Sequence, residues 1–141
     1  MLTIDEKVKV EIRHCPDCLS EDVDVRYTWE KLVGREEWED VRFLFPRIHC
    51  DKCGAVVEAC EASHVIHDAA CKAQGLLTPK EIRELRISID PAMDQKKFAK
   101  LLGCDEITVA RWENRERFQD ENWDRHIRMR CSENIGSNKG Y

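Results

Sequence analysis

Two cysteine pairs of identical spacing constrain this chain more than any other feature. Cys15 and Cys18 enclose two residues, as do Cys50 and Cys53, and 31 residues separate the two pairs. Two thiolates at this spacing can turn toward one cation from a tight turn, and a second such pair completes a tetrahedron of sulfur ligands. The spacing therefore predicts one Cys₄ site, in which Zn²⁺ is the expected ion. Four thiolates leave no open position for water, so the site is expected to be structural.

Alternatives to a zinc site stay open for these cysteines. They could form disulfides or remain unligated, and iron also suits a tetrahedral sulfur site. A thioredoxin-like motif has one Cys-x-x-Cys beside a βαβ pattern, which is not visible here. Eight cysteines would suit a secreted disulfide framework, but no apolar stretch near Met1 resembles a signal peptide, and no run is long enough to span a membrane. We therefore expect a reducing, cytoplasmic compartment and no membrane partner.

The distribution of charge favours two modules in the 141 residues. Residues 1–77 carry 10 Lys and Arg against 16 Asp and Glu, a net charge of −6, whereas residues 78–141 carry 13 against 12, a net charge of +1. An acidic first half and a near-neutral second half suit different partners, although ordinary solvated surfaces would give the same charges. A metal site is what a small module with a thin core needs.

Short strands are predicted between the cysteine pairs. The segments 23–27 and 41–45 place β-branched and aromatic residues at near-alternating positions, and the acidic stretch 30–40 reads as the exposed loop between them. The sequence therefore predicts a zinc ribbon of short antiparallel strands within residues 1–58.

The segment 59–77 is predicted to be a linking helix. Cys60, His64, His67 and Cys71 form one stripe of it. The stripe could hold a second metal ion, but four ligands spread over about 16 Å of helix cannot all reach one ion. Burial of this face is the favoured alternative, because free cysteine is a small apolar core residue.

Helix signals recur through residues 78–131, so an α+β chain is expected, in which an all-α bundle follows the ribbon. Thr78 and Glu81 form a capping box around Pro79. Further along, Asp94 and Asp105 are predicted caps.

The segment 95–114 holds two short helices joined by a turn that contains Gly103, a pattern typical of a helix-turn-helix. A later helix begins near Asn122 and closes the bundle or builds a dimer contact. Residues 132–141 are predicted to be a flexible tail.

The run QKKFAKLLGCDEITVARWEN at residues 95–114 resembles the Cro/C1-type (XRE) DNA-binding domain through its opening Gln, Ala-x-x-Leu-Gly and Arg-Trp-Glu. With the Cys₄ module, LLTPKEIRELR at residues 76–86 and Arg-Phe-Gln at 117–119, the chain resembles the MqsA/YgiT family of antitoxin-like regulators over roughly residues 13–131. It departs from the family at Leu19 and Arg115, where glycine is frequent.

The resemblance implies specific DNA contacts around a recognition helix in the major groove. Arg111 is the best candidate to read a base, because its planar fork matches guanine O6 and N7. Ile107 could touch a thymine methyl group, and Glu106 could accept from cytosine or neutralise the helix dipole. Phosphate contacts are expected from Gln95 and Thr108, and Arg115 is either a further phosphate contact or a solvated surface charge.

The sequence therefore predicts a DNA-binding transcriptional regulator that acts as a homodimer on a double-stranded operator. The resemblance implies the antitoxin or autorepressor of a toxin–antitoxin-like operon, whose acidic zinc module binds a basic toxin. A standalone regulator without a toxin and a zinc-dependent interaction adaptor are the alternatives. An enzyme is not expected, because no nucleophile, paired-carboxylate or open-metal constellation appears.

Overall fold

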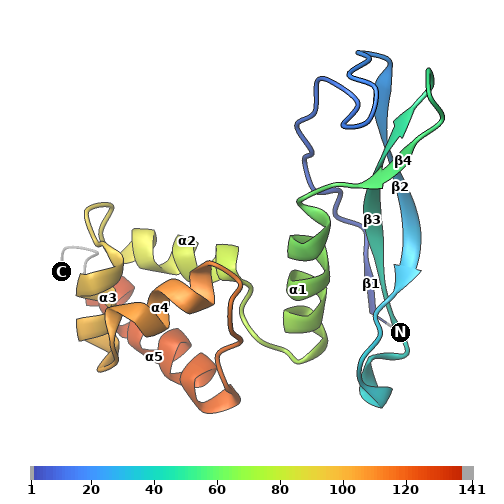
Figure 1. The fold of residues 1–141 in the computed structure, drawn as a ribbon. Helices are drawn as coiled ribbons and strands as arrows, with labels where there is room; N and C mark the ends of the chain where they lie inside the picture. Colours follow the sequence, from blue (N-terminus) through green and yellow to red (C-terminus); the bar gives the residue numbers. More distant parts are fainter. Residues whose placement is uncertain (1, 138–141) are drawn as a thin grey trace. The chain divides into compact units, whose positions relative to one another are not determined.

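Short strands occupy the first part of the chain and α-helices the remainder (Figure 1), which confirms the predicted α+β class. The computed structural model describes residues 2–137. The chain divides into two compact units, Met1–Ala73 and Gln74–Tyr141. The predicted linking segment 59–77 is therefore divided between the two units and does not stand between them.

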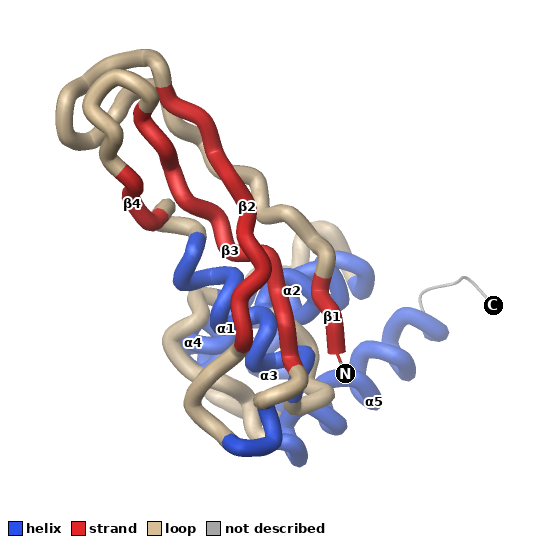
Figure 2. Tube along the Cα trace, turned by 90° about the vertical axis from the view of Figure 1, so that its right-hand side faces the viewer, coloured by secondary structure: helices blue, strands red, loops and turns tan. Residues whose placement is uncertain are grey.

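The sheet of the first unit is built around β3 (Val41–Cys50) (Figure 2). The strand β2 (Val23–Lys31) pairs antiparallel with β3 along its whole length. On the other side of β3, β1 (Leu2–Ile4) lies parallel to its first part and β4 (Val56–Glu58) antiparallel to its last part.

Both long strands extend beyond the predicted segments 23–27 and 41–45. A cross-strand ion pair supports the extension: the Arg47 guanidinium of β3 lies 2.9 Å from the Glu30 carboxylate of β2. The same guanidinium lies 4.7 Å from the ring centroid of Phe45 on its own strand. The predicted loop 30–40 therefore begins inside β2, and it contains a short 3₁₀ helix, η1 (Glu36–Trp38).

Helix α1 (Ala62–Ala73) belongs to the first unit because it packs against β3. Its buried side includes Ala69, Ala70 and Cys71. Lys72 on the same helix lies 3.4 Å from the Glu6 carboxylate in the N-terminal segment. The helix thus covers the sheet of its own unit.

The second unit contains α2 (Pro79–Ile89), α3 (Gln95–Leu102), α4 (Glu106–Glu113) and α5 (Glu121–Ser137). These helices share one apolar core, whose most deeply buried members are Ile82, Phe98, Val109, Ile127 and Cys131. Among the described helices, none is both long and apolar enough to cross a membrane.

Local capping explains where two of these helices begin and where one ends. Thr78 accepts from Glu81 N at 3.3 Å, and the Glu81 carboxylate accepts from Thr78 N at 2.9 Å. Asp94 caps α3 at 2.8 Å from Lys97 N, and Gly103 ends that helix with a φ of 82°.

One terminus prediction is confirmed in position only, and another was wrong. Asp105 occupies the N-cap position of α4, but its side chain makes no capping hydrogen bond. Helix α5 continues to Ser137, so the tail predicted from Ser132 is helical as far as that residue; residues 138–141 lie outside the described part of the chain.

A buried carboxylate fixes the start of the second unit. Asp124 on α5 accepts hydrogen bonds from Leu77 N at 2.8 Å, Gln119 Nε2 at 3.0 Å and Arg128 Nε at 2.8 Å. Gln119 also donates to Leu77 O, and Arg128 to Gly75 O. The segment before α2 is thus held by its own unit, and Arg128 is part of that network.

Candidate functional site

The two cysteine pairs meet at one end of the sheet. Cys50 is the last residue of β3, and Cys53 follows in the adjoining turn; Cys15 and Cys18 lie in a turn before β2. The Cys15 and Cys53 sulfurs are 3.7 Å apart, and those of Cys18 and Cys50 are 3.6 Å apart. All four sulfurs lie within 4.8 Å of one another. The predicted ligands are therefore brought together as one group.

These distances distinguish a metal cluster from disulfides. A disulfide requires about 2.0 Å between sulfurs, and both of these sulfur–sulfur distances are much longer. Four sulfurs at about 2.3 Å from a tetrahedral ion lie about 3.8 Å from each other. The observed spacing is close to this value, so the group could hold a metal ion. Cys15 and Cys50 are buried, and Cys18 and Cys53 lie at the surface.

Both cysteine turns have the same backbone geometry. Leu19 N donates to Cys15 O at 2.9 Å, and the equivalent Gly54 N donates to Cys50 O at 3.0 Å. The backbone φ is 62° at Leu19 and 76° at Gly54. The two turns are therefore structural repeats, although only one has glycine at the left-handed position.

Backbone N–H groups also point at the sulfurs. Asp17 N lies 3.4 Å from Cys15 Sγ, and Cys53 N lies 3.5 Å from Cys50 Sγ. The N–H groups of Cys53 and Lys52, against the effect of burial, lower the pKa of Cys50 to about 7. These donors stabilise a thiolate, which is the form that binds metal.

Crowding has the opposite effect on the neighbouring thiols of Cys18 and Cys53. The N–H of Ala55 favours the Cys53 thiolate, but burial and the neighbouring sulfurs raise the pKa of Cys53 to about 12. The N–H of Ser20 likewise favours the Cys18 thiolate, yet burial and Cys50 raise the pKa of that thiol. Four thiolates this close repel one another, and a cation between them would replace their protons.

The helical stripe does not form a second cluster. Cys60 is exposed and lies before the start of α1, His64 is exposed, and Cys71 is fully buried. Within residues 2–137, the four ribbon cysteines are the group whose ligand atoms lie close enough to share an ion. Cys71 is therefore a core residue.

Helix α4 exposes one side and buries the other. Ile107 and Arg111, one turn apart, are exposed together with Glu106 at the first turn. Val109 and Trp112 on the other side are buried in the core. The candidate base-reading residues thus share the accessible side of one helix.

The candidate phosphate contacts lie on that helix and on either side of it in the sequence. Gln95 is the first residue of α3 and is half-buried, as is Thr108 in α4. Arg115 follows α4 with a φ of 62°. Both positions where the resembled family often has glycine, Leu19 and Arg115, thus adopt left-handed backbone in this chain.

A buried ion pair that the sequence pattern did not predict orients α4. The Glu113 side chain is fully buried, and its two oxygens accept from Arg86 Nε at 3.0 Å and from Arg86 Nη2 at 2.9 Å. Arg86 also donates to Met93 O at 2.7 Å. Glu113 follows Val109 by four residues and therefore lies on the same, apolar face of the helix. A carboxylate on a buried face requires a nearby cation, so this position was the signal in the sequence for an ion pair.

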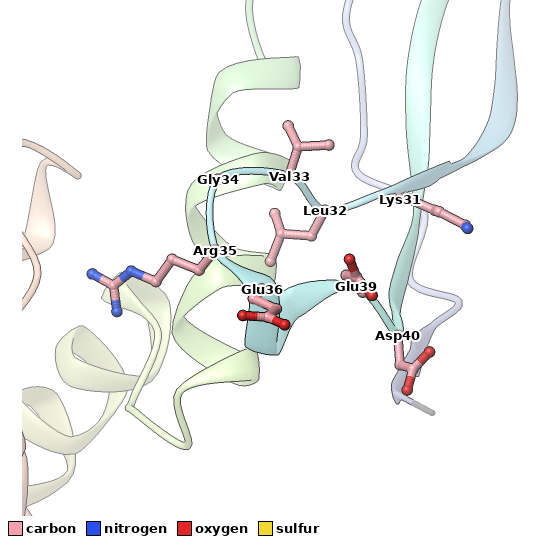
Figure 3. A pocket seen from close by; sticks show the side chains of 8 residues that line it. All are labelled: Lys31, Leu32, Val33, Gly34, Arg35, Glu36, Glu39 and Asp40. Atoms are coloured by element: carbon pink, nitrogen blue, oxygen red, sulfur yellow. The ribbon is translucent and has the colours of Figure 1, made fainter.

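An open pocket lies at the other end of the sheet, but the charged side chains that line it do not point toward one another. It is lined by residues 31–36, 39 and 40, and Figure 3 shows Lys31 and Arg35 pointing away from each other. The Arg35 guanidinium lies 4.9 Å from the ring centroid of the buried Trp38. Charged groups of mixed sign that do not converge give this pocket no catalytic arrangement.

Comparisons of the chain with protein-family models, with curated proteins and with solved structures found no match. The functional interpretation therefore depends on the residues and their geometry.

Proposed function

We propose that this chain is a sequence-specific regulator that binds double-stranded DNA through its second unit. In this proposal α3 and α4 form a helix-turn-helix, and α4 lies in the major groove. The supporting observation is the two-sidedness of α4, which presents Glu106, Ile107 and Arg111 to solvent while its other side is buried. A surface that presents a forked cation beside an exposed apolar side chain suits the edges of base pairs.

The rigid placement of α4 supports the same proposal. Base reading requires side chains held by packing on a regular element. Arg86 and Glu113 tie the end of α4 to α2, while Trp112 packs against Trp123 of α5 at 5.7 Å between ring centroids. These contacts leave the outer side of α4 uninvolved in the core.

Replacing Arg111 tests the proposal. A duplex site is first selected from a random DNA pool with the full-length protein, and its affinity for Arg111→Ala is then measured by fluorescence anisotropy. We expect a loss of about 1 to 3 kcal/mol and relaxed preference at one base pair. The control is Arg125→Ala, because Arg125 is an equally simple exposed cation whose described partner is Glu121 on the same helix. Equal affinities of wild type and Arg111→Ala would remove the assignment.

Salt dependence separates DNA binding from protein interaction. Contacts to several phosphates make the affinity for duplex DNA fall steeply as salt rises, since bound counterions are released. An interaction adaptor would instead show no salt-sensitive affinity for duplex DNA over the same range.

We propose Zn²⁺ as the ion of the Cys₄ group. The donor set is four sulfurs, their spacing fits zinc–thiolate bonds, and a closed shell suits a structural ion. All eight cysteines are free of disulfides, in keeping with a reducing compartment such as the cytoplasm. Elemental analysis of purified protein should give one zinc per chain; one iron per chain, with a coloured protein, would contradict the assignment.

The first unit is proposed to bind a protein partner as part of a toxin–antitoxin-like operon. The net charge of −6 over residues 1–77 suits a basic partner. Homodimers of the regulator would then place two α4 helices on two half-sites of the operator. Co-purification of a basic protein encoded beside the regulator would support the antitoxin role. A neighbouring gene product that neither binds the regulator nor is toxic when expressed alone would argue for a standalone regulator.

A further inference from the structure

One edge of β2 is open. At the two ends of the strand, Leu32 N donates to Val41 O and Asp51 N donates to Asp22 O, both at 2.9 Å. Residues of an antiparallel strand bond alternately to one neighbour and to the other side, and Asp22 and Leu32 both bond toward β3. The even-numbered residues of β2 therefore bond to β3, and the odd-numbered residues direct their N–H and C=O groups outward. We call this alternation the parity of the ladder. Within the described part of the chain, no strand pairs with that outer edge, and Figure 1 shows β2 as the outer strand.

The segment that passes near β2 does not pair with its outer edge. The Tyr27 hydroxyl donates to Val8 O, and Lys7 Nζ lies 5.5 Å from the centroid of the Tyr27 ring. These contacts involve the Tyr27 side chain on one face of the sheet. The outward backbone groups of Val25, Tyr27 and Trp29 have no partner in the described structure.

The side chains of β2 are arranged so that two antiparallel copies of the strand would be complementary to each other. Arg26 and Glu30 lie on one face of the sheet with Thr28 midway between them, and Tyr27 and Trp29 lie on the other face. Their exposure leaves room for a partner, since Trp29 is 52% exposed and the side chains of Arg26 and Glu30 are 53% and 38% exposed.

We propose that a second copy of this chain pairs with β2 through this edge, antiparallel and with Thr28 opposite Thr28 of the other copy. In that register Arg26 of each copy faces Glu30 of the other, and Tyr27 faces Trp29. The odd-numbered residues form the hydrogen-bonded pairs, as the parity of the ladder requires. Opposite charges and aromatic pairs directly across two strands are both stabilising, and the interface is symmetric.

Neighbouring registers that keep this parity lack the charge match. Pairing centred on Tyr27 places Asp24 opposite Glu30, and pairing centred on Arg26 places that cation opposite itself. Pairing centred on Trp29 leaves Glu30 opposite Thr28. Like charges directly across two strands are destabilising, so among these registers the one centred on Thr28 is the one that places Arg26 opposite Glu30 in both directions.

Arg26 and Glu30 also have partners within the chain, which shapes the test. Arg26 Nε lies 2.9 Å from the Asp24 carboxylate, and Arg47 NH2 lies 2.9 Å from the Glu30 carboxylate. Arg26 also lies 3.5 Å from the Asp51 carboxylate. Reversing the charges of Arg26 and Glu30 breaks these internal pairs and restores the pair between copies. Recovery in the double variant therefore reports on the interface. The interface lies in the first unit, and its test does not require DNA binding by the second.

Cysteine cross-linking measures the register. Thr28→Cys is made in a Cys60→Ser background of the full-length, zinc-loaded protein, and disulfide dimers formed with oxidised glutathione are followed on non-reducing gels. Residues opposite each other in a non-hydrogen-bonded pair are about 4.5 Å apart at Cα, within disulfide range. The control is Asp24→Cys, also exposed on the same face of β2, which does not face its own copy. We expect dimers to form roughly tenfold faster with Thr28→Cys; equal rates would overturn the proposal.

Charge reversal then tests the pairing in the Thr28→Cys background. Glu30→Arg places two cations opposite each other and should slow cross-linking severalfold, while Arg26→Glu combined with Glu30→Arg should restore the rate. Circular dichroism and zinc content confirm that each variant folds. A cross-linking rate that is unchanged by Glu30→Arg would contradict the proposed register. So would a double variant that cross-links as slowly as the single variant.

Discussion

Leu19 adopts a backbone conformation that glycine accepts more easily. It is 73% exposed and has a φ of 62°, at the position that Gly54 occupies in the second cysteine turn. Left-handed backbone costs an ordinary residue about 1 kcal/mol. We expect Leu19→Gly to raise the free energy of unfolding of the zinc-loaded protein by about 0.5 to 1 kcal/mol, measured by guanidinium denaturation.

The matched control is the reverse change at Gly54. A Cβ there meets no atom within 4 Å, so Gly54→Ala adds backbone strain without a clash. It should lower the free energy of unfolding by about 1 kcal/mol. Destabilisation by Leu19→Gly would show that the leucine side chain contributes more than its strain costs.

Cys131 should be much less reactive than the exposed thiol of Cys60. It is fully buried in the core, and burial raises its pKa from 9.0 to about 11. Thiolate is the reactive form, so alkylation of Cys131 in the folded protein should be far slower than that of the exposed Cys60. Mass spectrometry of peptides after timed iodoacetamide treatment measures both rates, and comparable rates at the two cysteines would contradict the buried placement.

The same thiol predicts a pH dependence. Below pH 9 both folded and unfolded Cys131 are protonated, and its effect on stability does not change with pH. Between pH 9 and about 11 the unfolded thiol ionises while the folded one does not, so the free energy of unfolding falls as the pH rises. Cys131→Ala should show a smaller fall over that range.

The Arg86–Glu113 pair is expected to decide whether α4 keeps its position. Glu113→Ala leaves Arg86 without its buried carboxylate, and such a loss costs about 3 to 5 kcal/mol. Thermal unfolding of the second unit, followed by circular dichroism, measures the effect. Replacing both residues, Arg86→Met with Glu113→Leu, removes both charges and should recover much of the stability. An unchanged unfolding temperature in Glu113→Ala would show that the pair does not hold the helix.

Signals confined to neighbouring residues were enough to predict most of the helices. Thr78, Glu81 and Asp94 cap through bonds that span three residues, and Gly103 ends its helix locally. The buried pair of Arg86 and Glu113 spans 27 residues, so neither residue alone revealed it.

The sheet shows the same limit. The four-cysteine cluster was predictable because its two halves carry an explicit spacing, and the β2–β3 pair because its residues alternate. Strand β1 has three residues, and its pairing partners begin at Val41. Its pattern is too short to predict a strand, because a segment of that length depends on the strand beside it. The packing of α1 on β3 likewise depends on tertiary contacts.

Removal of zinc by a chelator should unfold the first unit but not the second. The Cys₄ group joins the two cysteine turns of the first unit, so removing zinc should unfold residues 13–55, whereas the second unit has its own core and should stay folded. Each unit contains two tryptophans, Trp29 and Trp38 in the first, Trp112 and Trp123 in the second. After addition of a chelator, ¹H–¹⁵N spectra should lose the dispersed indole signals of the first pair and keep those of the second. Retention of all four would contradict a structural metal.

The buried carboxylate of Asp124 holds the first residues of the second unit in place. Leu77 N and O are both bonded from within that unit, so the segment that leads into α2 is held by residues of its own unit. A unit whose first residues are held by its own side chains is expected to keep its fold when gene recombination places a different sequence before it. The same network also predicts where a protease can divide the chain: a cut before Gly75 spares every one of these bonds, and a cut after Leu77 separates that residue from the unit that holds it.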